Sequence, residues 1–380
     1  MEAIPRTRAA IERGIDDGLH PGAQVCVWRA GSCVADEAYG EARDGVAMTP
    51  QAPTLWLSSG KPVLAVAVAR QVEAGAIDLD DPIAEYVPEF AERGKQDVAV
   101  RHVLTHTGGF RSVVFRYPQQ TWDEAVAAVC AGRLETGWTV GETAGYHPHS
   151  GWNILGRVLE VVSGEPLAAH LRGAVLEPWG LTRTWIGMPE PVYDAIGAEL
   201  SVMLDTSSPH GPPKPAGMHE RPWVTGQRPG GNAYGPASEL ARFYAGLLSG
   251  GELDGVRLLS PETVRHFTAR HRRDTTDRTF RAVMDWGLGF MVNNARHDAA
   301  NAEAHGSASG SGATPYGYGP YAGDDAFGHG GYQSSVGFAD PTHGLAVAVV
   351  FNGTPGEPRH QRRMHETLAA LYEDLGIAQT

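Results

Sequence analysis

The amino-acid sequence is poor in basic charge, in lysine, in cysteine and in long apolar runs. Its 380 residues include 31 Lys and Arg against 44 Asp and Glu, which gives a net charge of −13. A chain with this balance lacks the basic surface that attracts nucleic acid or an anionic membrane. No apolar stretch reaches the roughly 20 residues that a membrane-spanning helix needs. We therefore expect neither nucleic acid nor a membrane as a partner.

Several common motifs are also absent. Cys26, Cys33 and Cys130 form no C-x-x-C pair, and the four-residue spacing of His102 and His106 lacks the Glu of an H-E-x-x-H zinc site. No G-x-S-x-G elbow of the α/β-hydrolases occurs. The first eight residues contain no apolar segment of a secretory signal. We expect a cytoplasmic protein that uses no metal and no organic cofactor.

What the sequence does contain is a serine followed three residues later by one of its three lysines. Ser58 and Lys61 lie in L-S-S-G-K-P at 57–62. Residues three apart share one face of a helix, so the amine can reach the hydroxyl. A serine hydroxyl becomes a nucleophile when a base takes its proton, and a lysine with a lowered pKa is such a base. This is the S-x-x-K arrangement of penicillin-recognising enzymes.

The residues that follow favour this interpretation over a chance match. Residues 63–69 are apolar on every side of a helix, which predicts a helix buried in the core. Gly75 is its expected end. A nucleophile at the start of a central helix lies near the positive end of the helix dipole, which stabilises developing negative charge.

Both ends of the chain show strand patterns. Residues 22–28 with 33–39, and residues 334–339 with 345–351, are predicted as two hairpins. The chain between them is mainly helical in pattern. A sheet built from both chain ends, flanked by helices and carrying a mainly helical insertion, predicts an α+β fold.

This pattern divides the chain into two predicted domains. Residues 1–75 and 236–380 form the α/β domain with the sheet and the nucleophile helix, and residues 76–235 form the mainly helical inserted domain. Two irregular segments, 205–231 and 306–323, are predicted to wall the active site, because long loops in a compact enzyme are usually functional.

Two further groups match the needs of a serine nucleophile, which are a proton donor for the leaving group and donors for an oxyanion. Tyr146, in a turn-rich segment before a helix, is the candidate acid or base. The two glycines of H-G-G at 329–331 open a strand and allow a substrate to approach the backbone. The structural alternatives are a tyrosine that only packs and a simple β-bulge.

The order S-x-x-K, Tyr, His-Gly-Gly resembles the serine β-lactamase and penicillin-binding-protein superfamily, in particular its class C β-lactamase-like branch with the family VIII carboxylesterases. Supporting stretches cover most of the chain. They are V-R-H-V-L-T-H-T-G-G at 100–109, E-P-W-G-L-T-R-T at 177–184, G-G-N-A-Y-G-P-A-S-E-L-A-R-F at 230–243 and W-G-L-G-F at 286–290. The resemblance implies a β-lactamase-like fold.

The resemblance also implies roles for individual residues. Ser58 would be acylated, Lys61 would activate it, and Tyr146 would serve as general base or acid. The amides of Ser58 and Tyr332 would form the oxyanion hole. The expected substrate contacts are His329, Gly330, Gly331, Tyr332 and Trp152.

Two departures from the family pattern affect the expected substrate. Pro148 stands in place of the asparagine of Y-x-N, and His329 in place of the lysine of K-T-G. Both missing groups help to hold the amide and carboxylate of β-lactams and of D-Ala-D-Ala. Ester cleavage needs neither group, so the sequence favours an ester over a β-lactam.

We therefore expect a serine hydrolase that cleaves a carboxylic ester through an acyl-enzyme. Its partner would be a small-molecule ester or acyl donor. One alternative is an acyltransferase that moves the acyl group to an amine or alcohol acceptor, and another is a catalytically silent binding protein of the same fold. The oligomeric state does not follow from the sequence.

Overall fold

The structure is a computed structural model that describes residues 4–208, 211–305 and 316–378. Its centre is a seven-stranded antiparallel sheet in the order β13-β14-β15-β16-β1-β2-β3. The strands are β1 (Gly22–Arg29), β2 (Ser32–Arg43), β3 (Val46–Ala47), β13 (Met291–Val292), β14 (Phe327–Gly331), β15 (Ser335–Asp340) and β16 (Leu345–Phe351). Pairing of β1 with β16 joins the two ends of the chain, which confirms the predicted α+β class.

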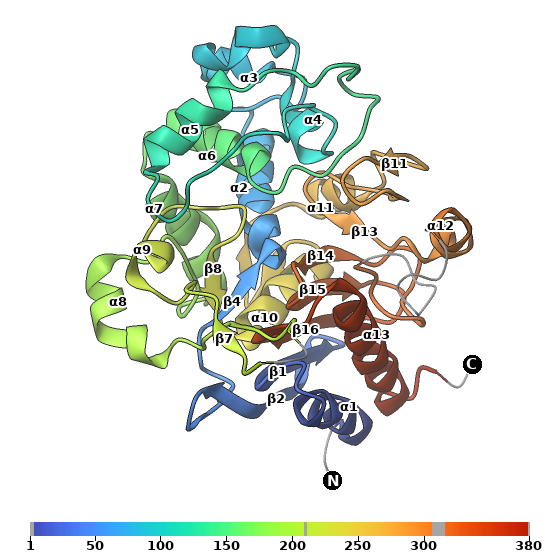
Figure 1. Cartoon of the computed structure of the whole chain (residues 1–380). Helices are drawn as coiled ribbons and strands as arrows, with labels where there is room; N and C mark the ends of the chain where they lie inside the picture. The colour runs from blue at the N-terminus through green and yellow to red at the C-terminus, as the bar shows by residue number, and fades with distance from the viewer. Residues whose placement is uncertain (1–3, 209–210, 306–315, 379–380) are drawn as a thin grey trace.

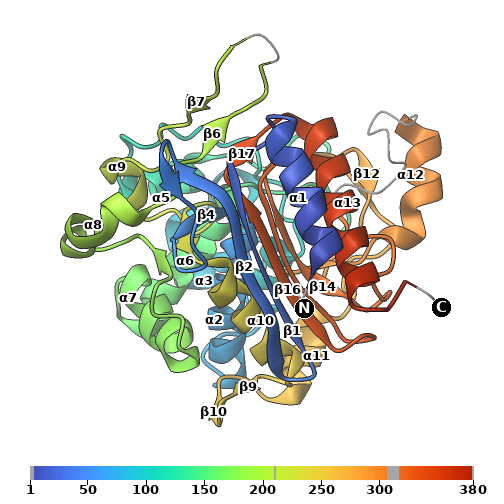
Figure 2. The same cartoon turned by 90° about the horizontal axis from the view of Figure 1, so that it is seen from below.

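Alternate side chains of the central strands pack into two different hydrophobic clusters, one on each face of the sheet. Val25 and Val27 of β1 pack in the cluster that contains Leu368 of α13, whereas Cys26 lies in the cluster that contains Leu240 of α10. Successive strand side chains point to opposite faces, so apolar residues at consecutive positions require cover on both sides. Figure 2 shows α1 and α13 side by side over one face, with α10 on the other.

The helices of the described chain supply this cover and the rest of the core. The one that follows the nucleophile, α2, passes through the middle of the molecule, and α3–α6 gather around its far end (Figure 1). The bounds are α1 (Pro5–Asp16), α2 (Lys61–Glu73), α3 (Ile83–Tyr86), α4 (Val100–Leu104), α5 (Trp122–Ala131), α6 (Ser150–Ser163), α7 (Leu167–Leu171), α8 (Glu190–Ile196), α9 (Arg221–Val224), α10 (Ala237–Leu248), α11 (Pro261–Thr268), α12 (Asp298–His305) and α13 (Glu357–Asp374). None of these described helices is long and apolar enough to span a membrane.

Short strands make the remaining connections. The sheet β4-β8-β5 contains one strand from residues 1–75 and two from residues 76–235, so the two predicted domains share backbone hydrogen bonds. The short strands are β4 (Thr54–Leu57), β5 (Trp185–Ile186), β6 (Leu204–Asp205), β7 (Lys214–Pro215), β8 (Ala233–Gly235), β9 (Glu252–Leu253), β10 (Val256–Arg257), β11 (Thr276–Asp277), β12 (Ala282–Val283) and β17 (Gly353–Thr354).

One buried amide ties the central sheet to the segment that leads to the nucleophile. Gln24 Nε2 donates to Thr49 O at 2.7 Å and to Ala52 O at 2.8 Å. Its Oε1 accepts from Thr54 Oγ1 at 3.2 Å and from Ala237 N at 3.0 Å. A strand, the approach to β4 and the start of α10 are therefore held together by one side chain.

Replacing this amide tests its contribution to stability. Gln24→Ala should lower the free energy of unfolding by about 2 kcal/mol or more, because buried polar groups lose their partners. The measurement is urea denaturation followed by tryptophan fluorescence. Gln96→Ala is the matched control, since the exposed Gln96 amide donates only to the neighbouring Asp97. Equal midpoints for the two variants would contradict the prediction.

Candidate active site

The predicted nucleophile, Ser58, lies on a tight turn between a strand and the central helix. Ser58 begins a 3₁₀ turn over Ser58–Gly60, and α2 starts at the next residue. The residue before it, Leu57, has φ 50°, a left-handed conformation that a branched side chain rarely adopts. In a 3₁₀ turn, residues i and i+3 are eclipsed, so the sharp turn brings Lys61 directly beside the Ser58 hydroxyl.

Lys61 is fully buried, and its amine is held in a fixed position. Its Nζ lies 2.9 Å from Ser58 Oγ and donates to the carbonyl oxygen of Gly230. The rings of Tyr146 and Trp152 lie 5.2 and 5.4 Å from Nζ. Burial lowers the pKa of Lys61 well below its ordinary value. In its neutral form the amine can donate to Gly230 and keep its lone pair for the serine proton.

Tyr146 reaches the same oxygen from the helical half of the molecule. Its hydroxyl donates to Ser58 Oγ at 2.9 Å, across 88 positions of sequence. Burial raises the pKa of Tyr146 above its ordinary value, and the nearby carboxylate of Asp277 raises it further. The phenol therefore stays protonated, and the structure brings Ser58, Lys61 and Tyr146 together as the sequence predicts.

A buried carboxylate that sequence reasoning missed positions Tyr146. Asp277 Oδ1 accepts from the backbone N–H groups of Tyr146 at 3.1 Å, Thr279 at 2.8 Å and Phe280 at 3.1 Å. Its Oδ2 accepts from Arg272 at 3.1 Å. No motif surrounds Asp277 in the sequence, because its role depends on a contact between segments 131 residues apart.

The H-G-G segment forms the end of strand β14 and borders the nucleophile turn. Ser59 Oγ donates to His329 O at 3.0 Å. A Cβ on Gly330 would lie 2.6 Å from Tyr316 Cδ1, and one on Gly331 would collide with Trp56 O, so both positions require glycine. The carbonyl of Gly330 lies 2.7 Å from His329 Nδ1, which assigns the proton to Nδ1. Nε2 is then a buried acceptor without a partner in the described structure.

The remaining predicted substrate contacts divide into two groups. Tyr332 is 58% exposed and borders the same cavity as Ser58 and Gly330; the oxyanion role of its amide stays a prediction. Trp152, expected to touch substrate, does not border the cavity in the described structure. It is fully buried, and its Nε1 donates to Lys61 O at 3.0 Å. Trp152 lies on the buried face of α6, where it holds the backbone of Lys61 and does not face the cavity.

The cavity above Ser58 has a volume of about 520 Å³, within the range of about 300–1,000 Å³ typical of small-molecule sites. Segment 205–231 contributes Met218, Trp223, Gly230 and Gly231 to its wall. Segment 306–323 contributes Tyr316, while residues 306–315 lie outside the described residues. The lining residues are Leu57, Ser58, Tyr146, Pro148, His149, Met218, Trp223, Gly230, Gly231, Thr279, Phe280, Met291, Tyr316, His329, Gly330, Tyr332 and Glu357.

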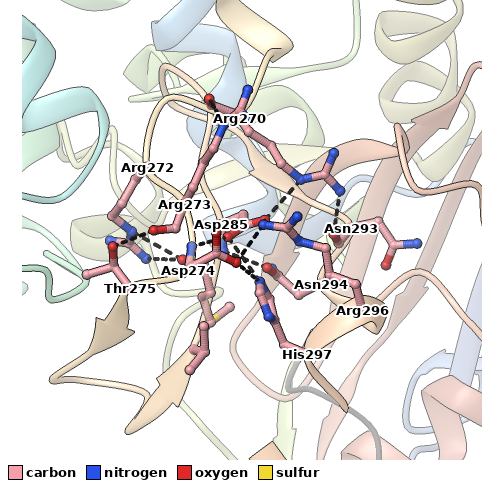
Figure 3. Close-up of polar contacts among 12 residues, drawn as sticks. Arg270, Arg272, Arg273, Asp274, Thr275, Asp285, Asn293, Asn294, Arg296 and His297 are labelled. Carbon is pink, nitrogen blue, oxygen red and sulfur yellow. Dashed lines mark hydrogen bonds and ion pairs between the residues drawn. The ribbon is translucent and has the colours of Figure 1, made fainter. Parts of the chain in front are cut away.

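One cluster within the described ranges has the composition of a metal site. Asp274, Asp285 and His297 place potential ligand atoms within 4.8 Å of one another. Figure 3 shows that arginines surround these carboxylates. Asp285 pairs with Arg270 at 3.0 Å and with Arg296 at 2.7 Å, and Arg296 also pairs with Asp274 at 2.8 Å. The anionic oxygens are thus already bound by guanidinium groups, which fits an ion-pair network better than a cation site.

The cluster is connected to the candidate active site through Trp286. Asp285 precedes Trp286, whose ring packs 5.7 Å from that of Tyr146 and 5.5 Å from that of His329. The histidines at 102 and 106 are likewise structural, since each accepts from a backbone N–H through Nδ1.

The sheet made from both chain ends and the Ser–Lys–Tyr site beside it are those of the β-lactamase and penicillin-binding-protein fold. The family model for beta-lactamases matches residues 7–371, and the chain belongs to that family, as its motifs predict. Esterase/beta-lactamase LipL of Mycobacterium tuberculosis is 26% identical over 360 residues, covering 87% of this chain and 77% of LipL.

Solved structures give the same result. A penicillin-binding protein homolog from Caulobacter crescentus superposes with a TM-score of 0.77 at 29% identity, covering 98% of each chain. A family VIII carboxylesterase superposes with a TM-score of 0.76 at 26% identity, covering 97% of each chain. The family thus includes both penicillin-binding-type proteins and esterases at similar distances from this chain.

The positioning role of Asp277 is testable through the pH dependence of Ser58. Asp277→Asn removes a negative charge beside Tyr146, so the pKa of Tyr146 should fall. The basic limb of fluorophosphonate labelling at Ser58 should then move to lower pH, and the maximal labelling rate should drop about tenfold or more. The measurement is the labelling rate by intact mass over a pH series.

A control separates positioning from loss of stability. Asp277→Asn leaves Arg272 as an unpaired buried cation, which is itself destabilising. The double variant with Arg272→Met removes both charges, and it should show the same shift of the basic limb. An unchanged basic limb in a folded single or double variant would contradict the positioning role.

Proposed function

We propose that this protein is a serine esterase that cleaves a small carboxylic ester through an acyl-enzyme on Ser58. The observation that carries the proposal is the double contact of Ser58 Oγ, 2.9 Å from Lys61 Nζ and 2.9 Å from the Tyr146 hydroxyl. One group is suited to take a proton and the other to donate one, and both reach the same oxygen at the wall of a cavity.

Acylation starts with proton transfer to Lys61. As Ser58 Oγ forms a bond to the ester carbonyl carbon, its proton moves to the neutral Nζ. Burial favours a neutral amine before the reaction, and the developing oxyanion compensates for the new ammonium charge. Expulsion of the leaving alkoxide breaks the carbon–oxygen bond, and Tyr146 donates the proton that converts it to an alcohol. A proton from Lys61 then restores the Tyr146 phenol.

Deacylation reverses these transfers with a second nucleophile. Water attacks the acyl carbonyl, gives up a proton to the Lys61–Tyr146 pair, and releases the acid while Ser58 Oγ regains its proton. An alcohol or amine in the same position would produce acyl transfer instead. The apolar lining that Met218, Trp223, Phe280 and Met291 provide supports transfer as a second candidate function, because it favours an organic acceptor over water.

The polar groups of the cavity support an ester over a β-lactam. Pro148 offers no side-chain donor or acceptor. His329 is neutral, since burial and the nearby Lys61 lower its pKa to about 3. Among the described lining residues, neither position supplies the amide-binding or carboxylate-binding group that helps to hold a β-lactam, whereas an ester requires only the nucleophile and an oxyanion site. A silent binding protein would have no need for the Ser58 contacts.

Removal of the reacting groups tests the mechanism. Ser58→Ala should reduce kcat for p-nitrophenyl butyrate by about 10³-fold or more. Lys61→Ala and Tyr146→Phe should each be severely impaired, and the double variant little worse than either, since groups that act as a unit are not additive. The measurement is steady-state hydrolysis, with circular dichroism as the folding control. If the two losses in kcat multiplied fully in the double variant, Tyr146 would have only a packing role.

Substrate preference tests the ester assignment. The kcat/KM for p-nitrophenyl acetate or butyrate should exceed that for nitrocefin, because the described lining of the cavity contains no Lys or Arg for the β-lactam carboxylate. A matched series with and without an added amine separates hydrolysis from transfer by the products formed. Faster turnover of nitrocefin than of both esters would assign the protein to β-lactam hydrolysis instead.

A further inference from the structure

The active-site cavity contains one carboxylate that the mechanism does not use. Glu357, the first residue of α13, borders the cavity together with Ser58 and Tyr332. No Lys or Arg borders the cavity in the described ranges, and the sequence of residues 306–315 contains neither. Glu357 is therefore the only charged side chain that the described lining presents to a ligand, once the histidines are shown to be neutral.

The histidines do not offset this charge. Burial and the nearby Lys61 together lower the pKa of both His149 and His329 to about 3. Both rings are uncharged near neutral pH, and His329 Nε2 adds an unpartnered acceptor to the cavity wall. The cavity therefore combines a carboxylate with neutral acceptors, which favours a ligand that carries positive charge and hydrogen-bond donors.

Neutral donors hold the Glu357 carboxylate in place. Oε1 accepts from Gln361 Nε2 at 2.6 Å, and Oε2 accepts from the Tyr316 hydroxyl at 3.1 Å. No ion pair to Glu357 occurs among the described residues. Burial raises the pKa of Glu357, and these hydrogen bonds lower it in part. A largely buried carboxylate is stabilised most by a cation, and here that cation has to come from the ligand.

A continuous aromatic wall connects this carboxylate with the nucleophile. The ring of Phe280 lies 5.0 Å from the ring of Tyr146 and 5.6 Å from that of Tyr316. Tyr316 packs against Gly330 and donates to Glu357. Aromatic faces attract ammonium groups, and attraction is strongest where water is displaced. The wall and the carboxylate together form a surface for a cation within the same cavity as Ser58.

We propose that Glu357, Tyr316 and Phe280 form a subsite for an ammonium group, protonated or quaternary, of the ester substrate. The substrate class is then a cationic ester, whose carbonyl carbon lies at Ser58 Oγ while its ammonium group lies at Glu357. This proposal rests on the proposed esterase function, because it assigns the second end of the same substrate. Experiment decides whether the ammonium group belongs to the acyl chain or to the leaving group of the ester.

Isosteric substrate pairs test the subsite in the unmodified protein. In the first pair the acyl chain of a p-nitrophenyl ester ends in a trimethylammonium or in a tert-butyl group. In the second pair butyrylthiocholine is compared with the thioester in which carbon replaces the quaternary nitrogen. In the pair whose charged end reaches Glu357, kcat/KM should be about tenfold or more higher for the cationic substrate than for its neutral isostere. This is the scale of one charge-assisted interaction. This preference should shrink as salt is added.

A matched pair of variants assigns the preference to the subsite. Glu357→Gln should abolish the cation preference while kcat/KM for the neutral isostere changes less than about threefold. Glu366→Gln removes the same charge from an exposed position of the same helix, and it should leave the preference intact. Turnover of the neutral isostere confirms that each variant is folded.

The possible failures are distinguishable. If the neutral esters are hydrolysed through Ser58 and neither cationic substrate is preferred, the subsite is overturned while the esterase function stands. A preference that Glu366→Gln removes as fully as Glu357→Gln overturns the subsite as well, since it reflects the charge of the whole surface. If no ester is turned over and Ser58 forms no adduct, the proposed function itself fails. If Glu357→Gln does not fold, the substrate pairs in the unmodified protein still decide whether a cationic substrate is preferred.

Discussion

Burial of the Lys61 amine is the condition on which the site depends. In the proposed mechanism the amine acts as a base, which requires a low pKa and hence a dry environment around α2. Residues 63–69, apolar on every side, provide this environment, and Trp152 and Gly230 complete the enclosure of Lys61. The same packing that stabilises the fold therefore lowers the pKa of the base, so stability and reactivity are coupled through one helix.

The central sheet brings the other half of the site to this helix. Strand β14 comes from the end of the chain, yet the carbonyl of His329 accepts from Ser59 beside the nucleophile. Ser335 Oγ, at the start of the neighbouring strand β15, donates to the Trp56 carbonyl at 2.6 Å, which holds β15 against the strand β4 that leads to the turn. Tyr146 enters from the helical half and is held by Asp277. Three distant segments thus meet around the turn that carries Ser58, each held by buried hydrogen bonds.

The proposed preference for an ester over a carboxylate-bearing β-lactam rests on the charge of the cavity. Members of the family include penicillin-binding-type proteins and esterases, and the nucleophile alone does not decide between the two. His329 stands where the family pattern has a lysine, and burial lowers its pKa to about 3, while Glu357 borders the same cavity with a carboxylate. In the proposed function these two side chains act on substrate selection and leave the Ser58 contacts unaltered, so one fold can keep its chemistry while its ligands differ.

The sequence by itself determined the local features: the S-x-x-K spacing, the apolar helix, the alternating strands and hence the α+β class. These depend on neighbours within a few residues, where spacing directly reflects geometry. Tyr146 and His329 were candidates from their local sequence, and the order of the family motifs then implied their roles. Tertiary structure alone decided that Asp277 holds Tyr146, that Trp152 supports Lys61 instead of contacting substrate, and that Glu357 faces the cavity. Each of these roles rests on contacts between residues far apart in the chain or on burial, and no spacing in the sequence encodes either.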